Sequence, residues 1–334
     1  MRNFGFVTVT GQAAGETWRR ALRTRDVWDE VAPRAGIAIE QRGLLVAARR
    51  PEAMAVLEAF AAGDMGADCA LLGRAEATAR VPALRAEALE GALWSPHERR
   101  VESRSAIPRL ARWLEAAMGV TIHRATHVHA AGGGRLETSR GRFTAERIVV
   151  CPGDERLALF PERFGDLGIA RVRLHMMKVA PAAPAPHLAA AVMSDLSLVR
   201  YLGWAALPVA EALARRLARE EAGKLAQGIH LIAVQGADGG LVVGDSHHHE
   251  PAPSPFAADH VDALILAELD AVLDLGARRV VERWQGTYAH LPDRRCVIDA
   301  PEPTTRLVVV TSGTGASTAF AIGEEVIQEL CGRG

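Results

Sequence analysis

The last part of the sequence contains a glycine-rich turn of the kind that binds anions. Residues 307–330 are LVVVTSGTGASTAFAIGEEVIQEL, an apolar run, a turn of Gly, Ser and Thr, and a helix-like segment. Glycines let the backbone approach a ligand, and free N–H groups at a helix start attract negative charge. The turn at 312–318 is expected to face a phosphate or a flavin, the alternative being a plain strand-to-helix turn. No G-x-G-x-x-G dinucleotide fingerprint stands upstream of it.

Three adjacent histidines, His247 to His249, raise the question of a metal site. Neighbouring side chains on an extended chain point in opposite directions, so at most two of the three could share one ion. The spacing of the surrounding residues matches no usual ligand pattern, and we predict no metal. Hydrolysis by a Ser-His-Asp triad is disfavoured as well, because no G-x-S-x-G elbow is present.

Composition describes an ordinary globular protein and excludes several classes of function. The 334 residues carry a formal net charge of −1, so no overall positive field attracts nucleic acid. The four cysteines are widely spaced and form no C-x-x-C pair, which favours a reducing, cytoplasmic setting over a disulfide framework. No apolar run approaches the roughly 20 residues of a membrane span, so we expect no membrane association.

Periodicity predicts the elements that position these residues. Helices are expected at 16–35, 51–62, 103–118, where Gly119 ends the helix, and 257–275. Residues 36–49 indicate two strands around a turn at Arg42 and Gly43, and residues 229–246 indicate a hairpin around 238–240. Short strands follow the third helix, and the last of them is buried and ends in Gly. This arrangement is typical of a nucleotide-binding domain.

The middle of the chain indicates an antiparallel sheet with one polar face. Residues 171–180, RVRLHMMKVA, alternate so that Arg173 and His175 share a face. Residues 197–204, SLVRYLGW, are a second candidate strand that carries Arg200 and Tyr201. The two strands could present cationic and hydroxyl donors to one cavity, where an anionic group would need them. A solvated sheet face is the alternative, because alternation alone does not distinguish a cleft from bulk water.

Several segments, in their order, make the chain similar to one family. RNFG, VTIHRATHV, IVVCPGD, RWQGTY and VVVTSGTGAST resemble the flavin-dependent amine oxidases of the D-amino-acid oxidase, glycine oxidase and sarcosine oxidase superfamily. SPHERRVE, LHMMKVAP, VGDSH and RWQGTYA resemble, more narrowly, the branch associated with aminophosphonate breakdown. The resemblance spans essentially the whole chain, and the order of the motifs carries it more than any one of them.

The resemblance implies a two-domain α/β fold. A Rossmann-like FAD/NAD(P)-binding domain would comprise residues 1–35, 100–165 and 290–334, and an antiparallel-sheet substrate domain residues 36–99 and 166–289. In the family the chain opens with a βαβ unit that carries G-x-G-x-x-G for the FAD pyrophosphate. That unit is missing here, so we expect an incomplete cofactor domain, either through a late start assignment or through a real truncation.

The resemblance also implies which residues contact non-covalent FAD. In sarcosine oxidases the cysteine that tethers the flavin corresponds to Gly286 here, so no covalent bond is expected. The turn at 312–318 would lie under the pyrimidine end of the flavin, where N–H groups stabilise negative charge on the reduced ring. The implied cofactor residues are Arg2, Asn3, Phe4, Gly5, Val128, Cys151, Gly153, Gly313, Thr314, Gly315, Ser317 and Thr318.

The implied function is oxidation of the C–N bond of a small amine, most directly an aminophosphonate, by hydride transfer to flavin N5. The expected substrate-binding residues are Arg173, His175, Arg200, Tyr201 and Tyr288, with His175 as the only candidate for a proton acceptor. Amino-acid-binding relatives carry an Arg near the position of Tyr288, which disfavours a simple α-amino acid. The alternatives are a truncated non-catalytic chain that cannot bind FAD, a general secondary-amine or amino-acid oxidase, and an NAD-type dehydrogenase. The oligomeric state stays open.

Overall fold

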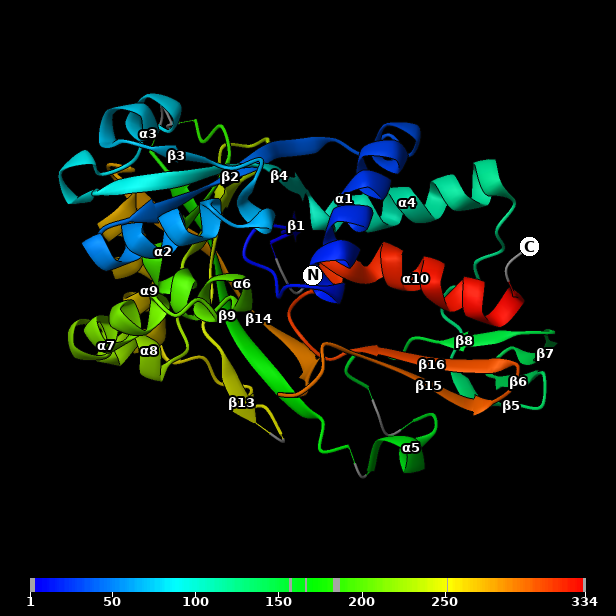
Figure 1. Ribbon diagram of the computed structural model, residues 1–334. Coiled ribbons are helices and arrows are strands. Elements are labelled where there is room, and N and C mark those ends of the chain that lie inside the picture. Colours follow the sequence, from blue (N-terminus) through cyan, green and yellow to red (C-terminus); the bar gives the residue numbers. More distant parts are fainter. Residues whose placement is uncertain (1–3, 156–157, 166, 183–186, 251, 333–334) are drawn as a thin grey trace.

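One large mixed sheet forms the centre of the computed structural model, which describes residues 4–155, 158–165, 167–182, 187–250 and 252–332 (Figure 1). Its strand order is β1-β4-β2-β10-β11-β12-β9-β13, with β14 paired to β9 and β3 paired to β4. All of these pairs are antiparallel except β10 with β2, which is parallel. The strands are β1 (Phe6–Val7), β2 (Ile39–Ala48), β3 (Ala70–Leu72), β4 (Gly91–Val101), β9 (Ala170–Pro181), β10 (Ala191–Ser194), β11 (Ile232–Gln235), β12 (Leu241–Gly244), β13 (His248–Glu250) and β14 (Arg278–His290).

Two small sheets lie at the other end of the molecule (Figure 1). The first has the order β15-β16-β8, and β16 runs parallel to β8. The second is the antiparallel sheet β5-β6-β7. Their strands are β5 (Val128–Gly132), β6 (Arg135–Thr138), β7 (Gly141–Thr144), β8 (Ile148–Val150), β15 (Cys296–Glu302) and β16 (Thr305–Val310).

Three long helices lie over the small sheets, the short helix α5 (Pro161–Gly165) lies on the other side of those sheets, and the remaining helices lie around the large sheet (Figure 1). The first group consists of α1 (Glu16–Arg34), α4 (Ser103–Met118) and α10 (Gly315–Cys331). Trp28 of α1 and Phe320 of α10 meet edge to face, with ring centroids 5.1 Å apart. The others are α2 (Pro51–Ala61), α3 (Arg74–Arg80), α5 (Pro161–Gly165), α6 (Leu202–Ala205), α7 (Ala210–Glu220), α8 (Ala222–Ala226) and α9 (Asp259–Val272), with the 3₁₀ turns η1 (Asp64–Gly66), η2 (Ala86–Ala88) and η3 (Asp195–Val199).

Both faces of the large sheet are buried. In β2, Leu44 and Val46 belong to a core shared with α2 and α7, whereas Leu45 and Ala47 belong to a core shared with α9. Because side chains alternate across a strand, this separation places helices on opposite faces. The predicted polar face of the middle sheet is therefore not a solvated one, and Arg173 and His175 of β9 are buried at 7% and 2% exposure.

Two predicted elements are wrong. Residues 36–49 contain one strand, β2, and not two, because Gly43, at φ +85°, lies in a bulge between Arg42 and Leu44 while both parts pair with β4. Residues 197–204 contain η3 and α6 instead of a strand, and Leu196, Ser197 and Leu198 are all buried, without the alternation of a half-exposed strand. The predicted helices and the hairpin are confirmed, including the helix 103–118 with Gly119 in the left-handed region.

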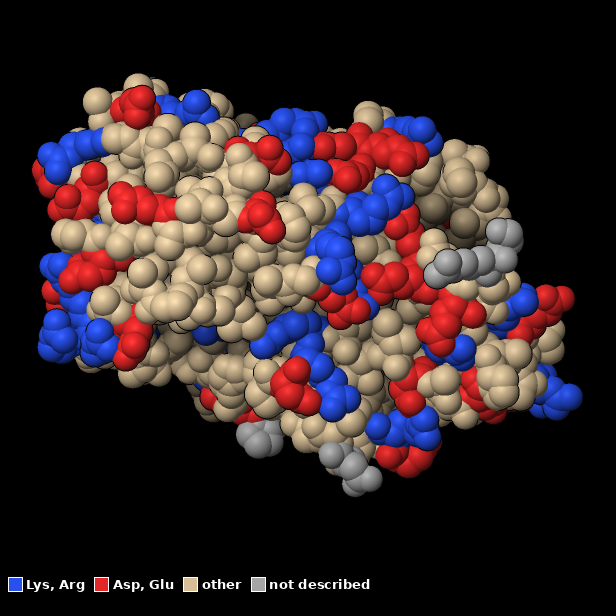
Figure 2. All heavy atoms as spheres, in the orientation of Figure 1, with Lys and Arg blue, Asp and Glu red and all other residues tan. Residues whose placement is uncertain are grey.

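The structure confirms the predicted α/β class, while the domain boundaries stay a prediction. The face shown in Figure 2 intersperses basic and acidic side chains, in agreement with the net charge of −1. Within the described part of the chain, every helix is too short or too polar to cross a membrane.

Candidate active site

A cavity of about 750 Å³ opens where the large sheet, the β15-β16-β8 sheet and the first turn of α10 meet. Its walls come from segments far apart in the sequence, among them the chain before α1, the end of β8, the end of β14 and the turn before α10. Most of the residues singled out in the sequence line this cavity: Phe4, Cys151, Gly153, Arg200, Tyr201, Tyr288, Gly313, Thr314, Gly315 and Ser317.

The glycine-rich turn presents backbone rather than side chains to the cavity. Its hydroxyl groups are bonded within the protein: Ser317 Oγ accepts the N–H of Thr8 at 2.8 Å, and Thr318 Oγ1 donates to Thr314 O at 3.0 Å. A Cβ built on Gly315 would meet nothing within 4 Å, and Gly315 is the first residue of α10. Since the first N–H groups of a helix have no intrahelical acceptor, this end of the cavity suits an anionic or electron-rich group.

Other expected cofactor residues lie farther from the cavity or serve the fold. Gly5 has φ +68°, and an added Cβ would lie 2.0 Å from Val101 O, so the strand β4 requires this glycine. Val128 begins β5 in the small antiparallel sheet and does not line the cavity. Thr318 is buried behind the turn. Arg2 and Asn3 lie outside the described residues.

Arg200, Tyr201 and Tyr288 form a polar wall of the cavity, and Tyr288 lies beside the turn, since a Cβ built on Gly313 would be 3.6 Å from the Tyr288 hydroxyl oxygen. Arg200 lies close to the Tyr288 hydroxyl and acts on it electrostatically. Burial raises the pKa of Tyr288 to about 12, so this hydroxyl stays protonated at neutral pH. Among the described residues, no carboxylate oxygen lies within 4.0 Å of the Arg200 guanidinium. Within the described part of the chain, Arg200 is therefore a cavity cation without a carboxylate in direct contact.

Arg173 and His175 are not part of this wall. Arg173 donates to Glu250 Oε1 at 2.9 Å, and its Nη1 lies 2.6 Å from His175 Nε2. His175 Nδ1 is 3.8 Å from Asp262 Oδ1 on α9. The structure thus brings Arg173 and His175 together with two carboxylates, outside the residues that line the cavity, and not with Arg200 as expected.

Two histidines and an aspartate that the sequence reasoning did not connect lie beside Arg200. His230 Nε2 is 3.1 Å from Asp245 Oδ1, and His247 Nε2 is 3.7 Å from Asp245 Oδ2. Burial lowers the pKa of both histidines. Burial also favours the neutral acid of Asp245, yet the fields of His247, His230 and Arg200 hold its pKa below the ordinary value. The cluster is thus a buried carboxylate between two neutral imidazoles.

The histidine run does not act as a unit. His247 joins the Asp245 cluster, His248 Nε2 lies 3.1 Å from Ser246 Oγ, and His249 packs against His290 with ring centroids 4.5 Å apart. Both His249 and His290 line the cavity, as does Arg295. The run itself was visible in the sequence, whereas the partners of its members depend on strand pairing.

The family model for FAD-dependent oxidoreductases of the DAO type matches residues 1–329. The chain belongs to the DAO family. FAD is therefore its cofactor, as predicted, and it is an oxidoreductase. No curated protein sequence matches the chain.

Solved structures of DAO-type enzymes share the fold at low sequence identity. Glycine oxidase from Geobacillus kaustophilus is 18% identical with a TM-score of 0.72, over 99% of this chain and 84% of that one. Glycine oxidase from Bacillus cereus is 15% identical with a TM-score of 0.76, over 98% and 83%. L-α-Glycerophosphate oxidase from Mycoplasma pneumoniae, with FAD bound, is 13% identical with a TM-score of 0.74, over 99% and 84%.

The cavity fits the flavin of the DAO family at its α10 end. The cradle of Gly313 and Gly315 offers close approach, and the start of α10 offers the dipole and free N–H groups that a flavin ring draws on. The Ser312 hydroxyl and the Thr311 N–H both bond to Arg295 O, at 3.1 and 2.9 Å, which fixes the turn. At the tether position, Gly286 of β14 offers no thiol, in agreement with non-covalent binding.

Proposed function

We propose that this DAO-family chain oxidises the C–N bond of a small amine that carries an anionic group, most directly an aminophosphonate. The supporting observation is Arg200, a cavity cation without a carboxylate partner among the described residues. Such a cation is stabilised by an anionic ligand, and charge-assisted hydrogen bonds are the strong ones. Arg295, a second cavity-lining guanidinium, would suit a group with more than one negative charge.

Each side of the cavity would have its own task. Bound FAD would accept the hydride from the carbon next to the substrate nitrogen, leaving an imine that water hydrolyses. Arg200 and the Tyr288 hydroxyl would hold the anionic end, which fixes the orientation of the C–H bond. The apolar wall around Phe4, Phe6 and Leu174 would limit the access of water.

The experiment is steady-state kinetics of Arg200→Ala with a panel of amines. Because a hydrogen bond to a charged group contributes roughly 1.5–3 kcal/mol, we expect the KM for 2-aminoethylphosphonate to rise by about ten- to a hundredfold. The KM for an uncharged alkylamine should change little. Arg279→Ala, which removes an exposed arginine from the same strand as Tyr288, is the matched control and should leave both values unchanged.

The same panel separates the proposal from its rival. If Arg200→Ala weakens every amine equally, or if sarcosine is the best substrate, the chain is a general secondary-amine oxidase and the anionic group has no role. Two of the similar solved structures are named as oxidases of small amines, a glycine oxidase and an iminodiacetate oxidase. Both outcomes leave the family assignment in place.

A further inference from the structure

The cluster of His230, Asp245 and His247 has the donor set of a metal site. Their ligand atoms all lie within 4.8 Å of one another, and the three residues line the cavity. A tetrahedral zinc ion with bonds of about 2.0–2.2 Å would place its donors roughly 3.4 Å apart. His230 Nε2 is 3.1 Å from Asp245 Oδ1 and His247 Nε2 is 3.7 Å from Asp245 Oδ2, both near that spacing, and donors as far apart as 4.8 Å would move closer together around an ion.

Backbone pairing holds the three residues in place. His230 and Asp245 exchange two backbone hydrogen bonds, of 3.3 and 3.0 Å, just beyond the end of the β11–β12 hairpin and one residue out of its register. His247 follows Asp245 by two residues, so on an extended chain its side chain is on the same side. Its N–H bonds to Gln227 O at 3.0 Å. The donors therefore lie in the short segments just before β11 and between β12 and β13, where these backbone hydrogen bonds hold them.

The hydrogen bonds around His247 leave its other ring nitrogen without a proton. His247 Nδ1 is 3.1 Å from Gly228 O, and a carbonyl oxygen can only accept, so Nδ1 carries the hydrogen. In the neutral ring Nε2 then carries a lone pair and faces Asp245 Oδ2, so two electron-rich atoms face each other without a hydrogen between them. Metal-bound histidines commonly donate their other N–H to a backbone carbonyl in this way.

Asp245 supplies a second, independent observation. The residue is 5% exposed, and its Oδ1 has no hydrogen-bond partner although it is buried. A buried carboxylate oxygen without a donor is costly. His230 Nε2, 3.1 Å away, stabilises the carboxylate, although its alignment with Oδ1 is poor for a hydrogen bond. A cation between the three groups would satisfy this oxygen and the lone pair of His247 together.

We propose that His230 Nε2, His247 Nε2 and the Asp245 carboxylate bind one divalent first-row transition metal ion in the wall of the cavity. Two imidazoles and one carboxylate suit zinc and its neighbours better than magnesium or calcium, which prefer all-oxygen ligands. The remaining coordination position faces the cavity and takes water or an anion. Arg200, whose positive charge acts on all three groups, opposes a second cation and favours an anion at that position.

The test is zinc binding by the purified full chain after treatment with a chelator, measured by calorimetry and by metal analysis after dialysis. We expect one zinc ion per chain. Asp245→Asn and His247→Ala should each weaken zinc binding by about 100-fold or more, because each removes a ligand. His248→Ala is the matched control, since His248 neighbours His247 but bonds to Ser246. It should bind zinc as the unmodified chain does.

Two further measurements guard against misfolded variants and adventitious thiol binding. Zinc should raise the Tm of the unmodified chain, because it binds only the folded state, and should leave the Tm of Asp245→Asn unchanged. Cobalt in place of zinc should give visible bands without a thiolate charge-transfer band. A thiolate band would assign the metal to the cavity-lining Cys151. That result, an absence of zinc binding, or zinc binding that survives Asp245→Asn would overturn the proposal.

Discussion

Gly5 shows at the scale of one residue how a sequence signal can have a different physical cause. The RNFG segment suggested a glycine beside the flavin. In the structure Gly5 is required by its own backbone, with φ +68° and Val101 O at 2.0 Å from a built Cβ. The Val101 N–H also donates to Gly5 O at 2.8 Å, which joins this segment to the end of β4. The glycine thus positions Phe4 at the cavity through a strand contact.

We predict that Gly5→Ala destabilises the protein strongly. The left-handed backbone costs an alanine about 1–2 kcal/mol, and the clash with Val101 adds a further ~1–3 kcal/mol. Gly119→Ala is the matched control, because Gly119 has the same φ of +68° but no atom within 4 Å of a built Cβ. Urea unfolding of both variants measures the difference. Equal losses of stability would show that contact with Val101 contributes nothing.

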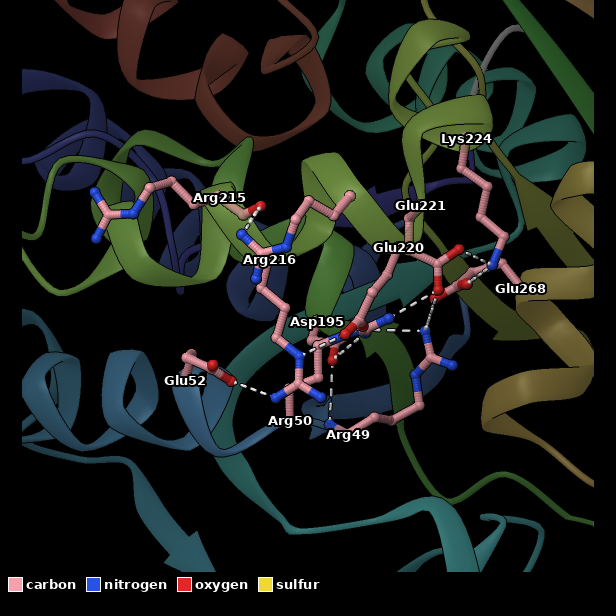
Figure 3. A network of polar contacts seen from close by, with 11 residues as sticks. Arg49, Arg50, Glu52, Asp195, Arg215, Arg216, Glu220, Glu221, Lys224 and Glu268 are labelled. Carbon is pink, nitrogen blue, oxygen red and sulfur yellow. Dashed lines mark hydrogen bonds and ion pairs between the residues drawn. The ribbon is translucent and has the colours of Figure 1, made fainter.

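At the scale of elements, a buried charge network joins β2 to η3 and three helices (Figure 3). Arg50, at the end of β2, donates to Asp195 at 2.9 Å, to Glu220 at 2.8 Å and to Glu221 at 2.8 Å. Glu268 of α9 accepts from Arg49 at 2.8 Å and from Lys224 at 2.6 Å. Since η3 leads directly to Arg200, this network anchors the segment that carries the cavity cation.

We predict that Arg50→Ala lowers the free energy of unfolding by about 3–5 kcal/mol. The substitution removes the guanidinium that pairs with Asp195 and so leaves a fully buried carboxylate without its main counter-charge. Arg215→Ala, on the exposed side of α7, removes only an ion pair with Glu211 and should cost less than about 1 kcal/mol. Chemical denaturation of the two variants provides the measurement. A loss below about 1 kcal/mol for Arg50→Ala would mean that Arg49 and Lys224 compensate fully.

The outcome of sequence prediction follows from how local each signal is. The helix at 103–118 ends at Gly119 because capping is decided by neighbouring residues. The strand expected at 197–204 failed because Asp195 is drawn to Arg50, 145 residues away, which no periodicity reveals. The glycine-rich turn was predicted as an anion site from equally local residues, and its contact with the flavin stays a prediction. His230 and Asp245 meet only because the β11–β12 hairpin brings its two ends together, a long-range pairing that no local pattern reveals.

At the scale of the whole molecule, stability should fall as the pH falls below about 6.5. Burial, with help from Arg173, lowers the pKa of His175, and burial also lowers that of His97. Hydrogen bonds from Arg50 lower the pKa of Glu220 to about 2, and one from Arg173 lowers that of Glu250 to about 2. In each case the unfolded chain binds protons more tightly, so acid favours unfolding.

We predict a decline in two stages when urea unfolding is followed from about pH 8 to about pH 3. Protonation of the histidines lowers the free energy of unfolding once the pH falls below their ordinary pKa of about 6.5. The carboxylates begin to lower it below about pH 4.5, and their stabilising contribution is lost as the pH approaches 2. Glu250→Gln should flatten the second stage, whereas Glu146→Gln, at an exposed position, should not. A urea midpoint that rises on acidification would contradict the assignment of these shifts.

Because α1 packs against α10, helix α1 cannot complete its packing until the end of the described chain has been synthesised. Arg20 bonds to Glu325, 305 residues farther along the chain, and Thr8 bonds to Ser317. At a translation rate of roughly 5–20 residues per second, α1 leaves the ribosome about 15–60 s before its partner helix is made. During that interval the inner side of α1, with Trp28 and Ala32, has no α10 to cover it and is a surface for chaperones. Any ligand that depends on the turn at 312–318 can bind only after that turn has been synthesised.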